Sequence, residues 1–158
     1  MRIKLFLFLI LITVPATASP QKKYIGYKHK GVLYGETLPN GVRDQGGGLL
    51  SNSNYGVTRF TRGSQYMLWL GKITSRDAKG VPRWVVRDVL TFDNLKKNQE
   101  FHFSYSSICR QNGRENLDMV VLAEFSPSKK TYQVVRAWRA NLKTEKFEKI
   151  SEKGIVCK

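Results

Sequence analysis

The sequence is poor in the residues on which most catalytic and metal-binding chemistry depends. Its 158 residues include two cysteines and two histidines, and only 12 acidic residues stand against 27 lysines and arginines. His29 and His102 are not spaced like metal ligands, either from each other or from the cysteines. We therefore expect no metal ion and no cofactor.

Recognised enzyme motifs are also missing. The chain has no Gly-x-Ser-x-Gly element of the kind that presents a nucleophilic serine in hydrolases. Gly46-Gly47-Gly48 is followed by Leu49-Leu50-Ser51, whereas a phosphate-binding loop needs Lys-Ser or Lys-Thr at that point. We interpret the three glycines as a flexible turn rather than a nucleotide site.

The chain has one long apolar run, and it lies at the N-terminus. The predicted mature part of the chain has none. Arg2 and Lys4 flank the start of an apolar stretch over residues 5–14, and Pro15-Ala16-Thr17-Ala18 follows it. This order predicts a signal peptide over residues 1–18 that is cleaved before Ser19. A retained anchor is the alternative, but the run has roughly half of the about 20 residues that a spanning helix needs. We expect a periplasmic or secreted protein with no membrane span after cleavage.

The two cysteines, Cys109 and Cys157, both lie in the predicted mature domain. In an oxidising compartment an even pair is most simply a disulfide, and free thiols or a metal site are the alternatives. A disulfide is the preferred prediction. It would close a large loop and stabilise the fold by roughly 4 kcal/mol on loop-closure entropy.

Negative charge is scarce throughout. The formal net charge is +15, and loss of Arg2 and Lys4 with the signal peptide would leave +13. Such an excess predicts attraction to polyanions such as envelope polymers, nucleic acid or an acidic protein. Simple solubility is the other interpretation, because the basic residues are scattered in runs no longer than two.

Helical periodicity is scarce as well, whereas alternation of apolar and polar residues is common after residue 64. Trp84, Val86, Leu90 and Phe92 are predicted to share one face of a strand, and Phe101, Phe103 and Tyr105 one face of the next. The strands are expected over residues 66–74, 81–92, 101–106, 117–125, 132–142 and 146–150. The fold class predicted is all-β: a small antiparallel meander that closes into a barrel or curved sandwich, with at most one short helix.

Residues 19–63 differ in composition from residues 64–158, which form the predicted antiparallel β core. Most of the glycines lie in this N-terminal part, together with many tyrosines, asparagines and serines. We expect a hairpin over residues 24–38 and a long loop over residues 40–55, both belonging to the same domain as the core. Loops of this length in a compact domain are usually functional or disordered.

Aromatic and basic residues in the N-terminal part are the predicted partner-binding surface. Tyrosine and arginine dominate protein interfaces, and few of these residues follow a core pattern. The candidates are Tyr27, Tyr34, Arg43, Tyr55, Arg59 and Arg62. The three tryptophans fall in phase with aliphatic neighbours, so core packing is favoured for them over a stacking platform.

One pair of residues has the chemistry of a general acid and base. Glu100 and His102 are two apart, so on a strand they would share a face, with Arg87 or Arg110 near enough to hold a phosphate. This is the pattern of a ribonuclease-type hydrolase. It is weak, because a solvated strand face explains His102 equally well.

Two functions follow. The preferred one is a secreted or periplasmic non-enzymatic binding protein for an anionic envelope polymer or an acidic protein, including an enzyme that it inhibits; nucleic acid is a possible but not a favoured partner. The alternative is the small secreted hydrolase, with Glu100 and His102 as the catalytic pair. A structural envelope component without a discrete site is a third interpretation. No catalytic residue is assigned under the preferred function.

Overall fold

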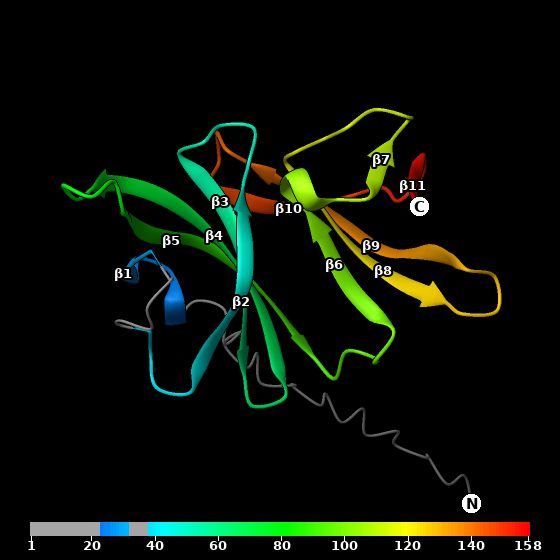
Figure 1. Cartoon of the computed structure of the whole chain (residues 1–158), viewed down its shortest axis with the longest axis horizontal. Coiled ribbons are helices and arrows are strands. Elements are labelled where there is room, and N and C mark those ends of the chain that lie inside the picture. The colour runs from blue at the N-terminus through cyan, green and yellow to red at the C-terminus, as the bar shows by residue number, and fades with distance from the viewer. Residues whose placement is uncertain (1–22, 32–37) are drawn as a thin grey trace, which may run out of the picture.

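The structure of the protein is a computed structural model that describes residues 23–31 and 38–158 (Figure 1). The predicted signal peptide, residues 1–18, lies outside the described residues. Within the described ranges, no helix has the length and apolar character needed to span a membrane.

The chain forms three antiparallel sheets. The largest has the strand order β1-β5-β4-β3-β2, the second has the order β10-β9-β8-β6, and the third pairs β11 with β7. The strands are β1 (Lys28–Lys30), β2 (Val42–Leu49), β3 (Tyr55–Arg62), β4 (Gln65–Arg76), β5 (Pro82–Asp93), β6 (Gln99–Phe103), β7 (Cys109–Gln111), β8 (Met119–Ser126), β9 (Thr131–Asn141), β10 (Lys146–Ile150) and β11 (Ile155–Cys157). A 3-10 turn, η3 (Ser104–Ser106), follows β6. The prediction of an all-β, antiparallel fold is confirmed.

The five-stranded sheet curls into a half-barrel, and ring contacts across its hollow side show the curl. His29 on β1 and Phe60 on β3 are three strand steps apart in the sheet, yet their ring centroids are 6.2 Å apart. In a flat sheet three steps of about 4.8 Å would separate them by roughly 14 Å. We call the hollow side the inner face and the opposite side the outer face. In Figure 1, β1 and β2 lie in front of β3, β4 and β5.

Irregularities in pairing change the face that a strand presents. The β4–β5 register shifts between Leu70 and Gly71, so that Arg87 is an extra residue on β5. As a result Val86 belongs to the inner cluster, whereas Leu90 and Phe92 pack on the outer face. The prediction that these residues share one face was wrong, because period-two alternation fails across a bulge.

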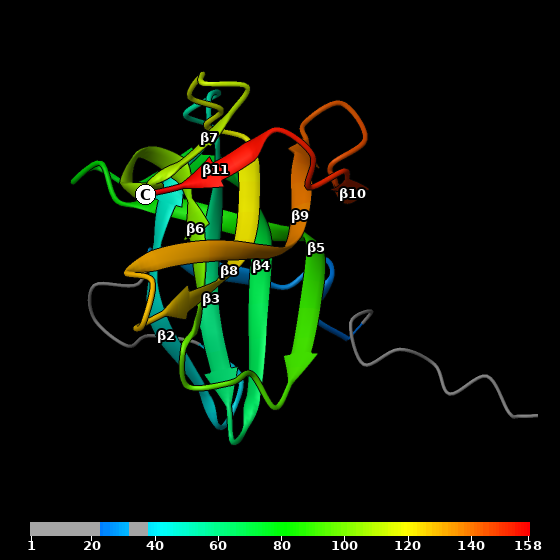
Figure 2. The ribbon, with the colours of Figure 1, turned by 90° about the vertical axis from the view of Figure 1, so that its right-hand side faces the viewer.

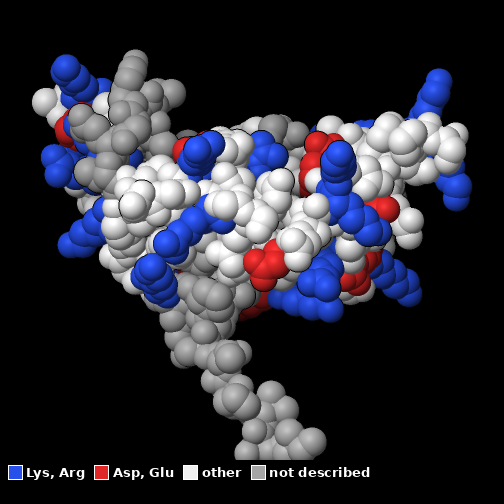
Figure 3. Space-filling model, turned by 90° about the horizontal axis from the view of Figure 1, so that it is seen from below, with Lys and Arg blue, Asp and Glu red and all other residues white. Residues whose placement is uncertain are grey.

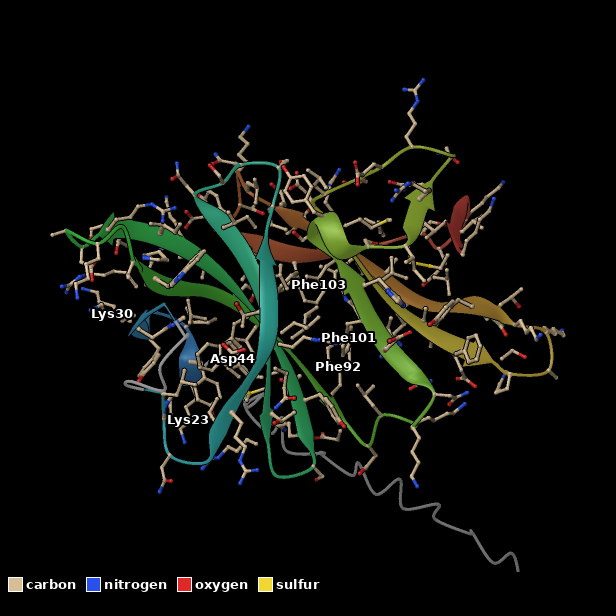
Figure 4. All side chains as sticks on the ribbon, in the orientation of Figure 1. Lys23, Lys30, Asp44, Phe92, Phe101 and Phe103 are labelled. Carbon is tan, nitrogen blue, oxygen red and sulfur yellow. A yellow bond between two sulfur atoms is a disulfide. The ribbon has the colours of Figure 1, made fainter. Side chains whose placement is uncertain are left out.

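The main core lies between the outer face and the four-stranded sheet. Figure 4 shows Phe92, Phe101 and Phe103 in this space, on the opposite side of β2 from Asp44. Fully buried residues of both sheets meet here, such as Leu68 and Val120. This face is therefore a conventional sandwich core.

A second core fills part of the inner face, and a third covers the far side of the four-stranded sheet. The inner cluster is Tyr24, Val42, Phe60, Met67, Trp69, Val86 and Val89. The third cluster includes Met119 and Val121 beneath β7 and β11, and strand β9 bends strongly around this side (Figure 2). Cys109 and Cys157 pair directly across β7 and β11 with their sulfurs 2.00 Å apart, so the predicted disulfide is confirmed.

The glycine-rich segment predicted as a loop over residues 40–55 contains strand β2 instead. Gly47 and Gly48 are needed because neighbouring atoms leave no room for a side chain. A Cβ on Gly47 would lie 2.6 Å from the carbonyl oxygen of Val57, and one on Gly48 would lie 2.5 Å from Ser104 Oγ. Composition suggested flexibility, whereas close packing is the reason for these glycines.

The N-terminal part and the predicted core are not separate layers. Strand β3 pairs with β4, and β1 pairs with β5, so residues on both sides of position 63 share one sheet. The strands of the predicted single meander over residues 65–157 are divided among all three sheets. Of the hairpin predicted over residues 24–38, β1 is paired with β5, and residues 32–37 lie outside the described residues.

Candidate functional site

The β1–β5 edge carries two candidate sites, one on each face. In this antiparallel pair His29 lies opposite Trp84, and Lys30 lies opposite Arg83. Directly opposite residues share a face, and neighbours along a strand alternate. His29 and Trp84 are therefore on the inner face, and Lys28, Lys30 and Arg83 are on the outer face.

The outer face at this edge is hollowed into what we call the outer basic groove. It has a volume of about 520 Å³ and is lined by Lys28, His29, Lys30, Thr74, Ser75, Arg83 and Trp84. The four-stranded sheet does not contribute to this lining. Figure 3 shows that lysines and arginines are spread over the face seen from below, with few acidic residues between them.

The cations of the groove differ in how they are neutralised. Lys30 Nζ lies 3.0 Å from Asp77 Oδ2, and this hydrogen bond lowers the pKa of Asp77. Lys28 and Arg83 are exposed and make no ion pair with any described residue. Lysine offers a compact charge and arginine a planar fork of donors, so the two together suit a phosphate, sulfate or carboxylate.

The inner face at the same edge holds a second hollow, which we call the inner pocket. It has a volume of about 580 Å³ and lies over the hollow side of the half-barrel. Its described lining is His29, Gly31, Asp44, Gly46, Gly47, Gly48, Leu49, Gly56, Thr58, Lys79, Gly80, Val81, Pro82 and Trp84. A pocket that is mostly apolar and has a few convergent polar groups is the usual form of a small-ligand site.

The pocket exists because glycines occupy the strand positions beneath a tryptophan. A Cβ on Gly71 would lie 2.9 Å from Trp84 Cε3, and one on Gly56 would lie 3.1 Å from Trp84 Cη2. The indole ring therefore rests on two glycine positions that have no side chain to displace it. Trp84 stays half-buried, whereas Trp69 and Trp138 are buried in the cores as predicted.

Two titratable side chains in the inner pocket have perturbed pKa values. Burial lowers the pKa of His29, and the nearby Asp44 carboxylate opposes this only in part. Burial raises the pKa of Asp44, opposed by the Gly46 N–H that donates to Asp44 Oδ1. At neutral pH the pocket thus presents an uncharged imidazole beside a partly desolvated carboxylate.

The predicted partner-binding residues do not form one surface. Tyr55 is buried in the main core, and its hydroxyl donates to Glu145 Oε1 at 2.8 Å. Tyr27 packs against the inner cluster, and Tyr34 lies outside the described residues. Two of the three predicted tyrosines therefore have packing roles.

The predicted arginines are divided between the two faces near β2 and β3. Arg43 is exposed and lies opposite Thr61, on the same face as Arg59. Arg59 donates to the carbonyl oxygen of Gln45 at 3.1 Å, and Arg62 donates to the Tyr24 hydroxyl at 3.2 Å on the other face. The structure does not place these arginines in either hollow.

Glu100 and His102 are brought together, as their spacing on β6 predicts. His102 Nε2 lies 3.5 Å from Glu100 Oε1, but the His102 side chain is only 10% exposed. Its Nε2 atom is shielded from solvent and has no hydrogen-bond partner. Burial lowers the pKa of His102, and its ring packs edge-on against Tyr132. This geometry favours packing over contact with a phosphodiester.

The residues of both hollows were only partly visible in the sequence. Arg83 follows the period of an exposed strand face, and Lys28 belongs to the basic N-terminal part. Nothing in the sequence pairs them, because β1 and β5 are joined only in the folded sheet. Asp44 and Trp84 carried no signal of a site, since the first lay in a predicted loop and the second in a predicted core.

No protein-family model, no curated protein and no solved structure matches this chain. Among residues 23–31 and 38–158, no group of three or more histidines, cysteines or acidic residues is placed to hold a metal ion. Function therefore has to be inferred from the two hollows of the β1–β5 edge.

Proposed function

We propose that the mature protein is a secreted or periplasmic, non-enzymatic binding protein that holds an anionic polymer in the outer basic groove. The observation that carries this proposal is that Lys28 and Arg83 line an open groove and have no acidic partner among the described residues. Two unpaired cations that line one groove retain their full attraction for an anion.

The contrast with neighbouring cations supports the proposal. On the same face, Glu145 accepts a hydrogen bond from Lys72 at 2.8 Å and forms an ion pair with Arg87. Glu145 comes from the β9–β10 turn, so the four-stranded sheet neutralises the cations that it covers. Lys28 and Arg83 lie beyond this cover and keep their charge for a ligand.

A polymer fits the groove better than an acidic protein does. Stable protein interfaces usually contain exposed aromatic or aliphatic anchors at their centre. The exposed large apolar residues of the described chain are Ile25, Leu49, Tyr66, Tyr105 and Val156, and none of them lines the groove. The unpaired charges and the Ser75 hydroxyl are complementary to a chain of anionic groups, whereas the Thr74 hydroxyl donates to the Arg83 carbonyl oxygen.

The test compares two double variants of equal charge. Lys28→Gln with Arg83→Gln removes one lysine and one arginine from the groove, and Lys129→Gln with Arg136→Gln removes the same pair from exposed positions on the β8–β9 hairpin. Binding of polyphosphate, dextran sulfate and uncharged dextran is measured by titration calorimetry over a series of salt concentrations.

We expect the groove variant to weaken binding of both polyanions at least tenfold and the hairpin variant to change it less than twofold. If each lost cation contacts the polymer, the slope of log Kd against log salt should fall by about two only in the groove variant. Equal losses in both variants would contradict the proposal and show that total charge alone binds. Capture of an acidic protein with no polyanion binding would contradict it as well.

A further inference from the structure

We infer that the inner pocket is a saccharide-binding site that holds pyranose rings of an oligosaccharide against Trp84. The two hollows share His29 and Trp84 in their linings, but the proposed polyanion is held by Lys28 and Arg83, which are on the other face of the sheet, so the inference does not depend on it. It assigns a ligand to the pocket from the chemistry of its lining residues.

The indole ring of Trp84 is fixed in an orientation that suits a flat ligand. Trp84 rests on the positions of Gly71 and Gly56, where a Cβ would approach its ring to 2.9 and 3.1 Å. Its place in the strand pair with β1 fixes its direction further. The negative face of an indole attracts positively polarised C–H groups, which a pyranose ring presents on one side. A preorganised ring of this kind loses little conformational entropy when it binds.

The polar groups of the pocket match hydroxyls rather than an anion. Asp44 offers carboxylate oxygens as acceptors, and His29 is held neutral by burial, so it can accept as well as donate. Phosphate would be repelled by Asp44, and Lys79 is the only cation in the described lining. Asp44 accepts from the Gly46 N–H and His29 Nδ1 lies 3.3 Å from the Lys30 carbonyl oxygen, and an entirely apolar ligand would offer nothing to their remaining polar atoms.

Glycines let the ligand approach the backbone. Gly46, Gly47 and Gly48 line one wall, and the position of a Cβ on Gly46 has no atom within 4 Å, so the space beside it is open. The β2–β3 register is interrupted between Asp44 and Gly47, so this part of β2 lacks a regular ladder to β3. In this stretch the Gly46 N–H donates to Asp44 and the Gln45 carbonyl oxygen accepts from Arg59, so the glycines serve the ligand by leaving space for it.

The pocket volume of about 580 Å³ lies within the range of roughly 300–1,000 Å³ that is typical of ligand sites. The hollow has room for a short oligosaccharide segment rather than a single small solute. Trp84, the pair of Asp44 and His29, and the glycines at positions 46–48 therefore all border the same space.

The experiment uses the mature protein, isotopically labelled for amide NMR, and three neutral probes: cellohexaose, chitohexaose and maltohexaose. The spectra are recorded at high salt, which suppresses binding to the outer basic groove. The amide signals of Gly46, Gly47, Gly48 and Gly56 report on the pocket directly, and the signals of Gly113 and Gly154 serve as distant controls.

Two pocket variants are paired with matched controls. Trp84→Leu keeps an apolar side chain at this position but removes the ring. Its control, Tyr105→Leu, removes an exposed ring that does not line the pocket. Asp44→Asn removes the charge with little change in shape, and Asp93→Asn does the same at an exposed position on β5. Thermal unfolding of each variant verifies that it is folded, and Asp44→Asn remains informative if Trp84→Leu is not.

We expect at least one probe to shift the pocket glycine signals, with a Kd that rises at least tenfold in Trp84→Leu and at least threefold in Asp44→Asn. The two control variants should bind as the unchanged protein does, and so should the groove variant Lys28→Gln with Arg83→Gln. The inference is overturned if none of the probes moves these signals, or if the pocket variants bind normally. Binding of extended peptides by the pocket in place of all three saccharides would also overturn it. Loss of polyanion binding alone would contradict only the proposed function.

Discussion

The two faces of the five-stranded sheet differ although the same strands build them. On β4, Leu68 and Leu70 point to the outer face and Met67 and Trp69 to the inner face, and all four are buried. The outer face is covered by a second sheet over much of its area. Among residues 23–31 and 38–158, the inner face is covered by its own curl and by residues near Tyr24, and an open pocket remains at the β1–β5 edge.

The difference shows that packing by another sheet decides which part of a face becomes a core and which stays open as a site. The pattern of side chains along the strands does not decide it. Where the four-stranded sheet lies opposite, large side chains fill the space and Glu145 neutralises the nearby cations. Where no described residue lies opposite, the outer face keeps unpaired cations, and the inner face keeps glycines beneath Trp84. Four experiments test this interpretation, beginning with the largest expected effect.

Removing the disulfide that holds β7 and β11 over the third cluster should have the largest effect. Cys109→Ser with Cys157→Ser opens a link between residues 48 positions apart that holds β11 against β7. We expect the free energy of unfolding to fall by about 4 kcal/mol, because the unfolded chain regains the entropy of the open loop. Urea denaturation measures the change. A loss below about 1 kcal/mol would mean that β7 and β11 stay in place without the disulfide.

Truncation of neighbouring residues on β4 tests whether both faces are true cores. Leu70→Ala opens a cavity on the outer face and Trp69→Ala one on the inner face, and both side chains are at most 1% exposed. Each should lower the free energy of unfolding by about 3 kcal/mol. A much smaller value for Trp69→Ala than for Leu70→Ala, measured by urea denaturation, would show that the inner cluster contributes little to stability.

A double-mutant cycle at the junction of β2 and η3 tests why glycine is required there. Gly48→Ala should cost about 2 kcal/mol, because its Cβ would lie 2.5 Å from Ser104 Oγ. Ser104 has φ +60° and donates to the carbonyl oxygen of Leu49. Ser104→Gly removes the obstructing side chain and suits this φ, so the double variant should be more stable than the sum of the single effects predicts. Additive losses in denaturation experiments would exclude the clash as the cause.

The smallest effect is expected at Glu145, which lies where the four-stranded sheet stops covering the outer face. Hydrogen bonds from Lys72, Tyr55 and Arg87 lower the pKa of Glu145 from 4.5 to about 2. A carboxyl group with a depressed pKa in the fold stabilises it above its unfolded pKa, so this contribution is lost as the pH falls from about 4.5 towards 2.

Glu145→Gln should therefore reduce stability at pH 7 by about 1 kcal/mol, since Lys72 and Arg87 remain partly solvated. The difference between the variant and the unchanged protein should shrink as the pH is lowered through this window. Urea denaturation at pH 7, 4 and 2.5 measures both. A difference that stays constant with pH would contradict the assigned pKa.

Much of the fold could be predicted because its signals are local. Alternation along residues 101–106 and 132–142 indicated strands, and the two cysteines in a protein with a predicted signal peptide indicated a disulfide. The first strand ends at Phe103, however, and Tyr105 is exposed in the 3-10 turn that follows, so its predicted place beside Phe101 and Phe103 was wrong. Strand β2 was missed because a run of glycines resembles a loop in composition. The demand for glycine at positions 47 and 48 comes from Val57 and Ser104, which are distant from them in sequence.

The candidate sites were less predictable than the fold. Glu100 and His102 are neighbours on one strand, so their contact followed from spacing, but the burial of His102 depends on Tyr132 from another strand. The predicted binding residues of the N-terminal part were chosen by composition. Composition does not tell which face of a strand a side chain occupies, and Tyr55 turned inward to the core.

The sequence by itself determined the antiparallel β character of this protein, its disulfide and its large positive charge. These depend on side-chain alternation, on cysteine count and on composition, which are all properties of the chain read in order. Only the tertiary structure decided that β1 pairs with β5, and that the sheet curls until His29 meets Phe60. Strand partners far apart in sequence are selected by packing across the whole domain. That selection brought Lys28 and Arg83 to one face and placed His29 beside Trp84 on the other.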